Sequence, residues 1–256
     1  MALVSLSAPI SKNYSSCFQL PKTKSSLWLA IKRILRNLAL YFIVSSMVLC
    51  LLLRWLPPPT TAFMLYRHYQ DLLEDQGYKP NHYNWVNSRQ ISPYAYAAAI
   101  AAEDQLFFDH FGFDLNSILS SISRYKDGGQ LRGASTISQQ VAKNLFLTPS
   151  KSFVRKGIEV WFTILIELLW SKDRILTVYL NIAEFGDHLY GIEAASQHYF
   201  KVSAKKISGS QAALLAATLP NPSKLKTNRP SNYLFQRQRW ILRQMQNLGN
   251  AVYHNH

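Results

Sequence analysis

Residues 97–114 read AAAIAAEDQLFFDHFGFD, an alanine-rich run that leads into a dense group of carboxylates and aromatic rings. Just upstream, Ser92 and Pro93 predict a helix start, because serine can cap a first turn and the fixed φ of proline suits it. The run Tyr94–Ala102 is uncharged and rich in alanine. We therefore expect a helix that is buried on most sides, with the rest of the chain packed around it.

Glu103 and Asp104 end this run, and Phe107 and His110 follow closely. A carboxylate at the edge of an apolar helix costs free energy unless partners compensate its charge. Phe107 would shield the pair from water, and Gly112 would allow the chain to turn sharply. An ordinary helix end with solvated acids fits the same residues, so this stretch alone does not decide between a site and a surface.

The net charge of +14 is divided unevenly along the chain. Up to Arg54 there are seven lysines and arginines and no acid, and the remainder carries 21 basic against 14 acidic residues. A basic domain suits an anionic partner such as nucleic acid, a lipid surface or a phosphate-bearing substrate. Charge alone does not choose among these partners.

A membrane anchor is predicted near the N-terminus. Leu38–Leu53 has no charged residue, and Trp55 and Leu56 extend it towards the ~20 residues that cross a bilayer. Basic residues lie mostly before this span, so the N-terminus should be cytoplasmic. A cleaved signal peptide is disfavoured because no small-x-small site precedes the three prolines at 57–59. We predict a disordered basic cytoplasmic tail (1–27), a membrane anchor (28–56, apolar span 38–56) and a periplasmic domain (57–256).

The two cysteines, Cys17 and Cys50, fall in the predicted tail and the predicted span, so they cannot pair with each other. Stability of the exported domain must then come from packing rather than disulfides. No CxxC, His-rich or Asp-rich spacing suggests a structural metal, and we predict no metal-binding residue.

The domain after the prolines has helical periodicity almost throughout, and no alternating strand run stands out. A glycine-rich loop at Tyr125–Gly133 should divide an earlier from a later set of helices. Helical patterns cover Ala62–Glu74, Tyr94–Phe107, Leu115–Tyr125, Phe153–Trp170, Arg174–Ala183, Gly191–Tyr199, Ser210–Leu219 and Asn232–Leu248.

A second polar motif, GASTISQQVAKNL, begins at Gly133. Thr136 and Gln139 fit a capping box, and this purely structural role is the simplest interpretation of the pair. It does not explain Gln140, Lys143 and Asn144, which fall on one face of the new helix at i, i+3 and i+4. Two amides and an ammonium on one face of a helix are suited to binding a phosphate or the hydroxyls of a sugar.

Three further blocks complete the pattern. Arg155, Lys156 and Glu159 have the spacing of helical ion pairs, which on a surface would contribute little. However, the helix that follows, VWFTILIELLW, is too apolar for a solvated face. The other two blocks are KDRILTVYLN at Lys172–Asn181, which runs into AEFG, and GIEAASQHYF at Gly191–Phe200.

In this order and spacing, the five blocks resemble the peptidoglycan glycosyltransferases of family 51, most closely the monofunctional membrane-anchored members, over roughly Pro57–Leu248. The resemblance implies an all-α, lysozyme-like, two-lobed domain behind a single N-terminal transmembrane helix. Ser138 replaces a usual threonine and keeps its hydroxyl. Thr177 replaces a frequent glutamate, so that carboxylate is not required here. Lys201–Val202 replaces a usual Gly-Lys.

The resemblance implies an inverting polymerase that transfers the growing lipid-linked glycan onto the GlcNAc 4-hydroxyl of lipid II. The β-1,4 product forms with release of undecaprenyl pyrophosphate. Burial would raise the pKa of Glu103 and suit it as the base, and Glu159 would organise cations or contact the oxocarbenium ion. The expected substrate-binding residues are Asp104, Phe107, His110, Ser135, Thr136, Gln139, Gln140, Lys143, Asn144, Arg155 and Lys156.

No cofactor is evident, although a divalent cation (Mg or Mn) could assist the pyrophosphate, with Asp104 as a candidate ligand or positioning group. The expected partners are lipid II, the lipid-linked glycan chain and an anionic membrane surface, with other cell-wall synthesis or division proteins as further candidates and no nucleic acid. The expected location is the cell inner membrane.

Two alternatives remain from the residues. A lysozyme-like cutting enzyme would leave the Arg-Lys cluster without a role, and a non-catalytic membrane-tethered binding module would not need the acid-plus-cation arrangement. A membrane-facing surface is also predicted: Phe111–Tyr125 groups apolar residues beside Arg124 and Lys126, as in segments that lie among lipid headgroups. Packing into the core is the competing fate of this segment.

Overall fold

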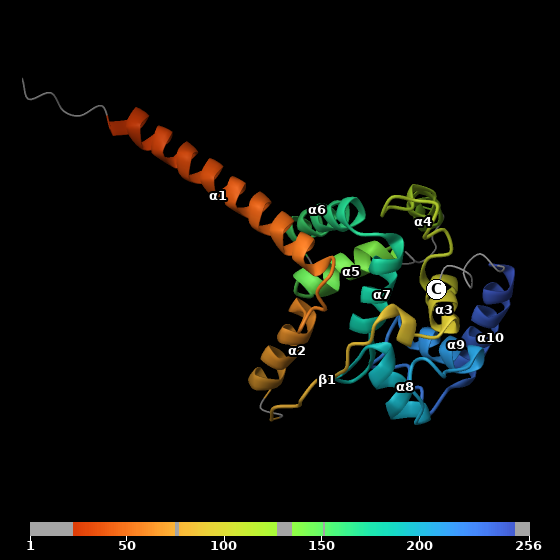
Figure 1. Ribbon diagram of the computed structural model, residues 1–256. Coiled ribbons are helices and arrows are strands. Elements are labelled where there is room, and N and C mark those ends of the chain that lie inside the picture. The colour runs from red at the N-terminus through yellow and green to blue at the C-terminus, as the bar shows by residue number, and fades with distance from the viewer. Residues whose placement is uncertain (1–22, 75–76, 127–134, 151, 249–256) are drawn as a thin grey trace, which may run out of the picture. The chain divides into compact units, whose positions relative to one another are not determined.

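The computed structural model describes residues 23–74, 77–126, 135–150 and 152–248 (Figure 1). The described chain is mostly helical, which confirms the predicted all-α class. The helices are α1 (Thr23–Leu53), α2 (Ala62–Leu73), α3 (Pro93–Glu103), α4 (Leu115–Lys126), α5 (Ile137–Phe146), α6 (Phe153–Leu169), α7 (Lys172–Ile182), α8 (Ile192–Phe200), α9 (Gly209–Thr218) and α10 (Asn232–Asn247), with a short 3₁₀ turn at Ser88–Gln90.

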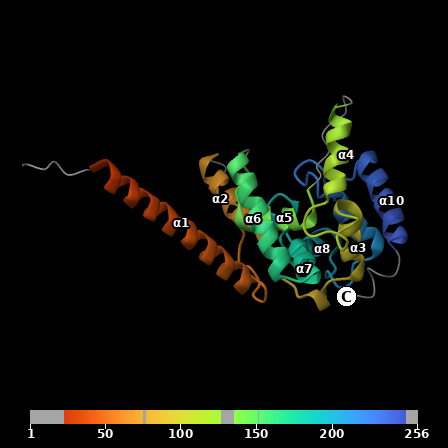
Figure 2. The same cartoon turned by 90° about the horizontal axis from the view of Figure 1, so that it is seen from above.

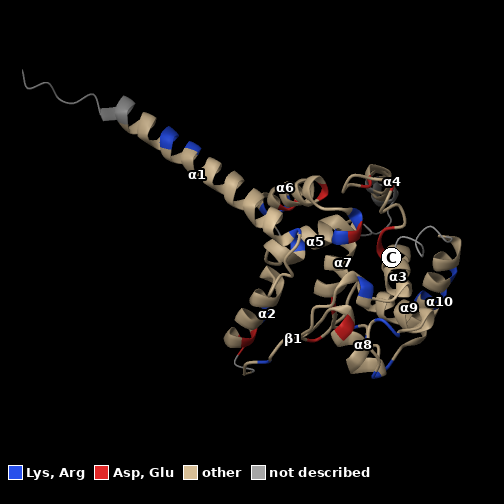
Figure 3. Cartoon of the chain, viewed as in Figure 1, with Lys and Arg blue, Asp and Glu red and all other residues tan. Residues whose placement is uncertain are grey.

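Contacts divide the chain into two compact units, Met1–Ser45 and Ser46–His256. The first contains most of α1, whose stretch Leu27–Leu53 has a mean hydropathy of 1.9 and is long and apolar enough to cross a membrane. Its lysines and arginines lie in the N-terminal half, and the rest of the helix carries none (Figure 3). The helix begins at Thr23, inside the segment that we expected to be disordered, while residues 1–22 lie outside the described residues.

In the second unit, α3 forms the centre as predicted. The Ser92 hydroxyl accepts a hydrogen bond from the Tyr94 N–H at 3.3 Å, and every residue from Ala95 to Ala101 is buried. The prediction that this helix continues to Phe107 is wrong. Asp104 leaves the helical conformation, with φ −162° and ψ 78°, because its carboxylate instead bonds the first turn of α5.

Two groups of helices pack around this centre (Figures 1 and 2). On one side, α3 lies against α9 and α10, and on the other, α5 lies against α6 and α7. Between Tyr125 and Gly133, where a loop was expected, α4 still includes Tyr125 and Lys126, and the remaining positions lie outside the described residues.

A small sheet was missed by the sequence analysis. β1 (His82–Tyr83) pairs in parallel with β3 (Leu189–Tyr190), which pairs antiparallel with β2 (Glu184–Gly186). Strands of two or three residues are too short to show an alternating pattern, so their absence from the prediction has a simple cause. The sheet ties the segment after α2 to the connection between α7 and α8.

Candidate active site

A cleft of about 860 Å³ opens between the two groups of helices. The cleft is lined by residues from the end of α3, from α5 and Ser135 just before it, from the segment after α9, and from α10. Its lining residues are Ala102, Glu103, Ser135, Gln140, Lys143, Leu219, Pro220, Tyr233, Gln236, Arg237 and Trp240. Four of the residues predicted for substrate chemistry thus meet in one place: Glu103, Ser135, Gln140 and Lys143.

Glu103 lies at the wall of this cleft, with a side chain only 13% exposed. Nε2 of Gln140 donates to its Oε2 at 3.0 Å, and Nη2 of Arg237 lies 3.5 Å from its Oε1. Burial raises the pKa of Glu103, and the hydrogen bond from Gln140 and the charges of Arg237 and Lys143 only partly oppose it. The carboxylate is therefore a stronger base than an exposed glutamate.

Asp104 is turned away from Glu103 and holds two structural partners. Its Oδ2 accepts the backbone N–H of Ile137 at 3.0 Å, and its Oδ1 lies 2.9 Å from Nε2 of His110. Burial raises the pKa of Asp104, while His110 acts in the opposite direction. Both oxygens are engaged, so the geometry favours Asp104 as a positioning group that joins the end of α3 to the start of α5.

Phe107, three residues after Asp104, is fully buried. Nζ of Lys172 lies 4.6 Å from the centre of its ring and donates to the His110 carbonyl at 2.7 Å. The same ammonium lies 2.9 Å from Oε1 of Glu167, which also accepts the Ser138 hydroxyl. The hydroxyl that Ser138 keeps in place of threonine therefore has a partner, in a buried network that supports the cleft.

Thr136 and Gln139 form the predicted capping box, which confirms that interpretation. Thr136 Oγ1 also donates to the Gly112 carbonyl at 2.7 Å. Gly112 has φ +76°, as the predicted sharp turn requires, and a Cβ there would lie 2.9 Å from Thr163. Thr136 and Gln139 are buried and engaged in holding α5, so their direct contact with a substrate stays a prediction.

Two residues of α5 reach the cleft from one face, as the spacing predicted. The Tyr179 hydroxyl donates to Gln140 Oε1 at 3.3 Å, which orients the amide whose nitrogen bonds Glu103. Burial lowers the pKa of Lys143, while the charges of Glu159 and Glu103 raise it. Asn144 is half-buried on the same helix and is not among the residues that line the cleft.

The third motif forms a compact ion cluster at the start of α6. Nη1 of Arg155 lies 2.8 Å and Nζ of Lys156 lies 2.5 Å from the oxygens of Glu159, so both predicted pairs are confirmed. The Glu159 side chain is only 3% exposed, which excludes the alternative of an ordinary solvated salt bridge. These three residues are outside the lining of the cleft, and their charges act on Lys143, which belongs to that lining.

The contribution of α10 was not predicted from the sequence. Tyr233, Arg237 and Trp240 occupy positions i, i+4 and i+7 and turn one face of this helix towards the cleft. The spacing was visible in YLFQRQRW. Nothing local, however, indicates that Arg237 meets Glu103, 134 positions away.

The chain is similar to known proteins over most of its length. Residues 70–246 match the family model described as Transglycosylase. The chain is 52% identical over 210 residues to the biosynthetic peptidoglycan transglycosylase of Mannheimia succiniciproducens, covering 82% of this chain and 86% of that one. It is 48% identical over 219 residues to the enzyme of that name from Stutzerimonas stutzeri, covering 86% and 90%. The chain therefore belongs to the transglycosylase family and is a glycosyltransferase.

Proposed function

We propose that this enzyme polymerises lipid II into glycan strands of peptidoglycan at the cell inner membrane. The observation that carries the proposal is Glu103, a buried carboxylate with a raised pKa in a cleft that also presents Gln140, Lys143 and Arg237. Joining lipid-linked sugars needs a base for the acceptor and positive charge for a departing pyrophosphate. The cleft offers both kinds of group.

In the proposed reaction, Glu103 removes the proton of the GlcNAc 4-hydroxyl of lipid II. The oxygen attacks C1 of the growing lipid-linked chain from the face opposite the pyrophosphate. The new β-1,4 bond forms as the C1–oxygen bond to undecaprenyl pyrophosphate breaks, which inverts the configuration. Gln140 keeps the carboxylate oriented, since its amide is itself held by Tyr179.

Lys143 is the cation best suited to the leaving group. It lines the cleft, and its partial desolvation strengthens its interaction with an anion. Arg155 and Lys156 add positive charge behind it and are held by Glu159. In this proposal Glu159 organises these cations, because its two oxygens are already engaged by them.

The remaining predicted substrate residues keep their assignment as part of the proposal. Ser135 lines the cleft directly. Asp104, Phe107 and His110 are outside this lining and support the segment between α3 and α5, while Thr136 and Gln139 fix the start of α5. A Mg or Mn ion could assist the pyrophosphate. The engagement of both Asp104 oxygens argues against Asp104 as its ligand.

In the proposed setting, α1 is a single-pass anchor with a cytoplasmic N-terminus, and the enzyme works in the periplasm. Its apolar length and the basic residues of its first half support this orientation. Phe111, Leu115 and Leu119 are exposed near α4, which favours the predicted contact with an anionic lipid surface over burial in the core. Phe113 is half-buried, and the side chains of Ile118, Ile122 and Arg124 lie outside the described residues.

Polymerisation of purified lipid II by the full chain in detergent tests the proposal. Glu103→Gln should abolish polymer formation while the protein still folds. Glu184→Gln is a matched control, because burial also raises the pKa of Glu184, to about 7, and Glu184 is outside the cleft lining. A cutting enzyme would instead shorten preformed glycan strands, and a binding module would leave lipid II unchanged.

A further inference from the structure

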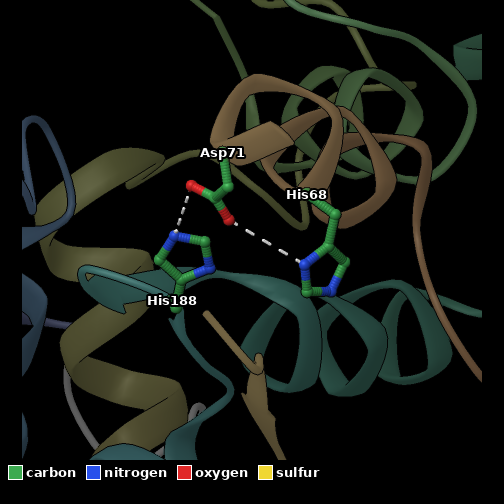
Figure 4. A group of neighbouring side chains, drawn as sticks. All are labelled: His68, Asp71 and His188. Atoms are coloured by element: carbon green, nitrogen blue, oxygen red, sulfur yellow. Dashed lines mark ion pairs between the residues drawn. The ribbon is translucent and has the colours of Figure 1, made fainter. Parts of the chain in front are cut away.

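A second group of ionisable side chains lies apart from the cleft, where α2 meets the turn between β2 and β3 (Figure 4). His68 and Asp71 are at i and i+3 on α2, so both point to the same side of the helix. His188 comes from the β2–β3 turn and has φ +54°, an unusual conformation for a residue with a side chain. One ligand atom from each of the three residues lies within 4.8 Å of the other two.

Two polar atoms at the centre of this group have no hydrogen-bond partner. They are Nδ1 of His68 and Oδ2 of Asp71, which are both out of contact with solvent and 4.0 Å apart. That separation is too long for a hydrogen bond. It exceeds the ~3.3 Å between two ligands of one tetrahedral ion with bonds of about 2.0 Å, so the two atoms would move closer on sharing an ion. A cation between the two atoms would satisfy both.

His188 presents a third ligand to the same point. Its Nε2 lies 3.3 Å from Oδ1 of Asp71, and its Nδ1 lies 3.0 Å from Oδ1 of Asn81. A proton on Nδ1 donates to this amide oxygen, which leaves the Nε2 lone pair directed at the carboxylate. His188 and Asp71 are both more than nine-tenths buried. A positive charge between them removes the repulsion of a lone pair facing a carboxylate.

We propose that His68 Nδ1, Asp71 and His188 Nε2 form a binding site for a divalent transition metal of the Zn²⁺ class. Two imidazoles and one carboxylate are a ligand set typical of such ions and a poor one for Mg²⁺ or Ca²⁺, which prefer oxygen alone. The site is separate from the active-site cleft, since none of its residues lines it. The bound ion would fasten α2 to the small sheet.

Asn81 sets how tightly the ion binds. Its Nδ2 lies 2.8 Å from Nε2 of His68 and donates to it, so the ring proton of His68 sits on Nδ1. When the metal takes Nδ1, that proton moves to Nε2, which then faces an amide donor. Asn81 can therefore keep only its bond to His188. A carboxylate at position 81 would accept from both rings and free both ligand atoms at once.

Calorimetric titration of the full chain in detergent with ZnCl₂ tests the site. We expect one equivalent to bind, and the midpoint of thermal unfolding to rise by about 5 °C when free Zn²⁺ is a hundred times Kd. His68→Ala and Asp71→Asn should each weaken binding by more than the ~10–100-fold typical of losing a hydrogen-bonding partner of a ligand. His198→Gln, which changes an exposed histidine that is not one of the three ligands, should bind as the unmodified chain does.

Asn81→Asp gives a test that loss of folding cannot imitate, because it should tighten Zn²⁺ binding by about tenfold. The helical circular dichroism of each variant without metal checks that it folds. The proposal is overturned if the unmodified chain binds no stoichiometric Zn²⁺. It is equally overturned if folded His68→Ala binds as well as His198→Gln does, or if folded Asn81→Asp fails to gain affinity. Each of these Zn²⁺-binding results is independent of lipid II polymerisation, the function proposed for the cleft.

Discussion

Two glutamates, Glu103 and Glu159, are both largely withdrawn from water, with side chains 13% and 3% exposed, yet their surroundings differ. Glu103 meets an amide at 3.0 Å and a guanidinium at 3.5 Å, beside an open cleft. Glu159 is held by two cations at 2.8 and 2.5 Å, away from the cleft lining. A weakly compensated carboxylate can take up a proton, while one held by two cations acts as their counter-charge. These surroundings support the two different roles that we propose for the two glutamates.

The largest expected effect is that of Glu103→Gln, which keeps the shape and removes the base. Polymerisation of lipid II should fall by ~10²–10⁴, while Glu184→Gln retains activity. The rate of polymer formation at saturating lipid II measures both. A Glu103→Gln enzyme with near-normal turnover would remove the functional difference between the two glutamates.

Lys143→Ala should reduce turnover by about 10² or more, because one group that stabilises developing charge is lost. The comparison should be repeated with a lipid-linked sugar that carries a single phosphate. The variant should lose less with this substrate, since less negative charge leaves. Equal losses on both substrates would assign Lys143 to folding or to sugar binding instead.

Glu159→Gln should act mainly on stability, since it leaves Arg155 and Lys156 without their shared counter-charge. We expect unfolding to cost about 1–3 kcal/mol less, because the two cations are partly exposed and water compensates them in part. Denaturant unfolding measures this loss. The acid limb of the pH–rate profile should stay where it is in the unmodified enzyme. A shift of that limb would make Glu159 a candidate base.

Arg237→Gln should change the pH dependence more than the maximal rate. The positive charge of Arg237 lowers the pKa of Glu103, so its removal raises that pKa further. The base works only when deprotonated, and the acid limb of kcat/KM should therefore move to higher pH. The profile of Arg239→Gln, on an exposed position of the same helix, is the control.

The smallest effect is expected for the exposed apolar residues of α4. Their substitution should leave the roles of Glu103 and Glu159 unchanged. Leu115→Ser with Leu119→Ser should weaken binding to anionic vesicles several-fold, about 1 kcal/mol, in a chain that begins after Pro59. Vesicle co-sedimentation and the unfolding midpoint measure the two quantities. Unchanged vesicle binding, or a lower midpoint instead, would assign these residues to the fold.

Local features were predictable because helix geometry determines them. The Ser92 cap, the capping box at Thr136 and Gln139, and the cations around Glu159 all join residues within four positions of each other. The contact of Arg237 with Glu103 joins residues 134 positions apart. His188 contacts Asp71 across a similar separation along the sequence. Such contacts depend on how helices pack, which periodicity does not report. The five motifs supplied the site only through their resemblance to a known family.

The bond from the Ile137 N–H to Asp104 has a consequence for the dynamics of the enzyme. Amides in the first turn of a helix normally lack a partner within that helix and exchange rapidly with solvent hydrogen. This one is buried and bonded to the carboxylate of Asp104, which directly follows α3, so it can exchange only when the end of α3 and the start of α5 separate. Its exchange rate measures how often the catalytic framework opens, and it can be followed at a single residue without any substrate present.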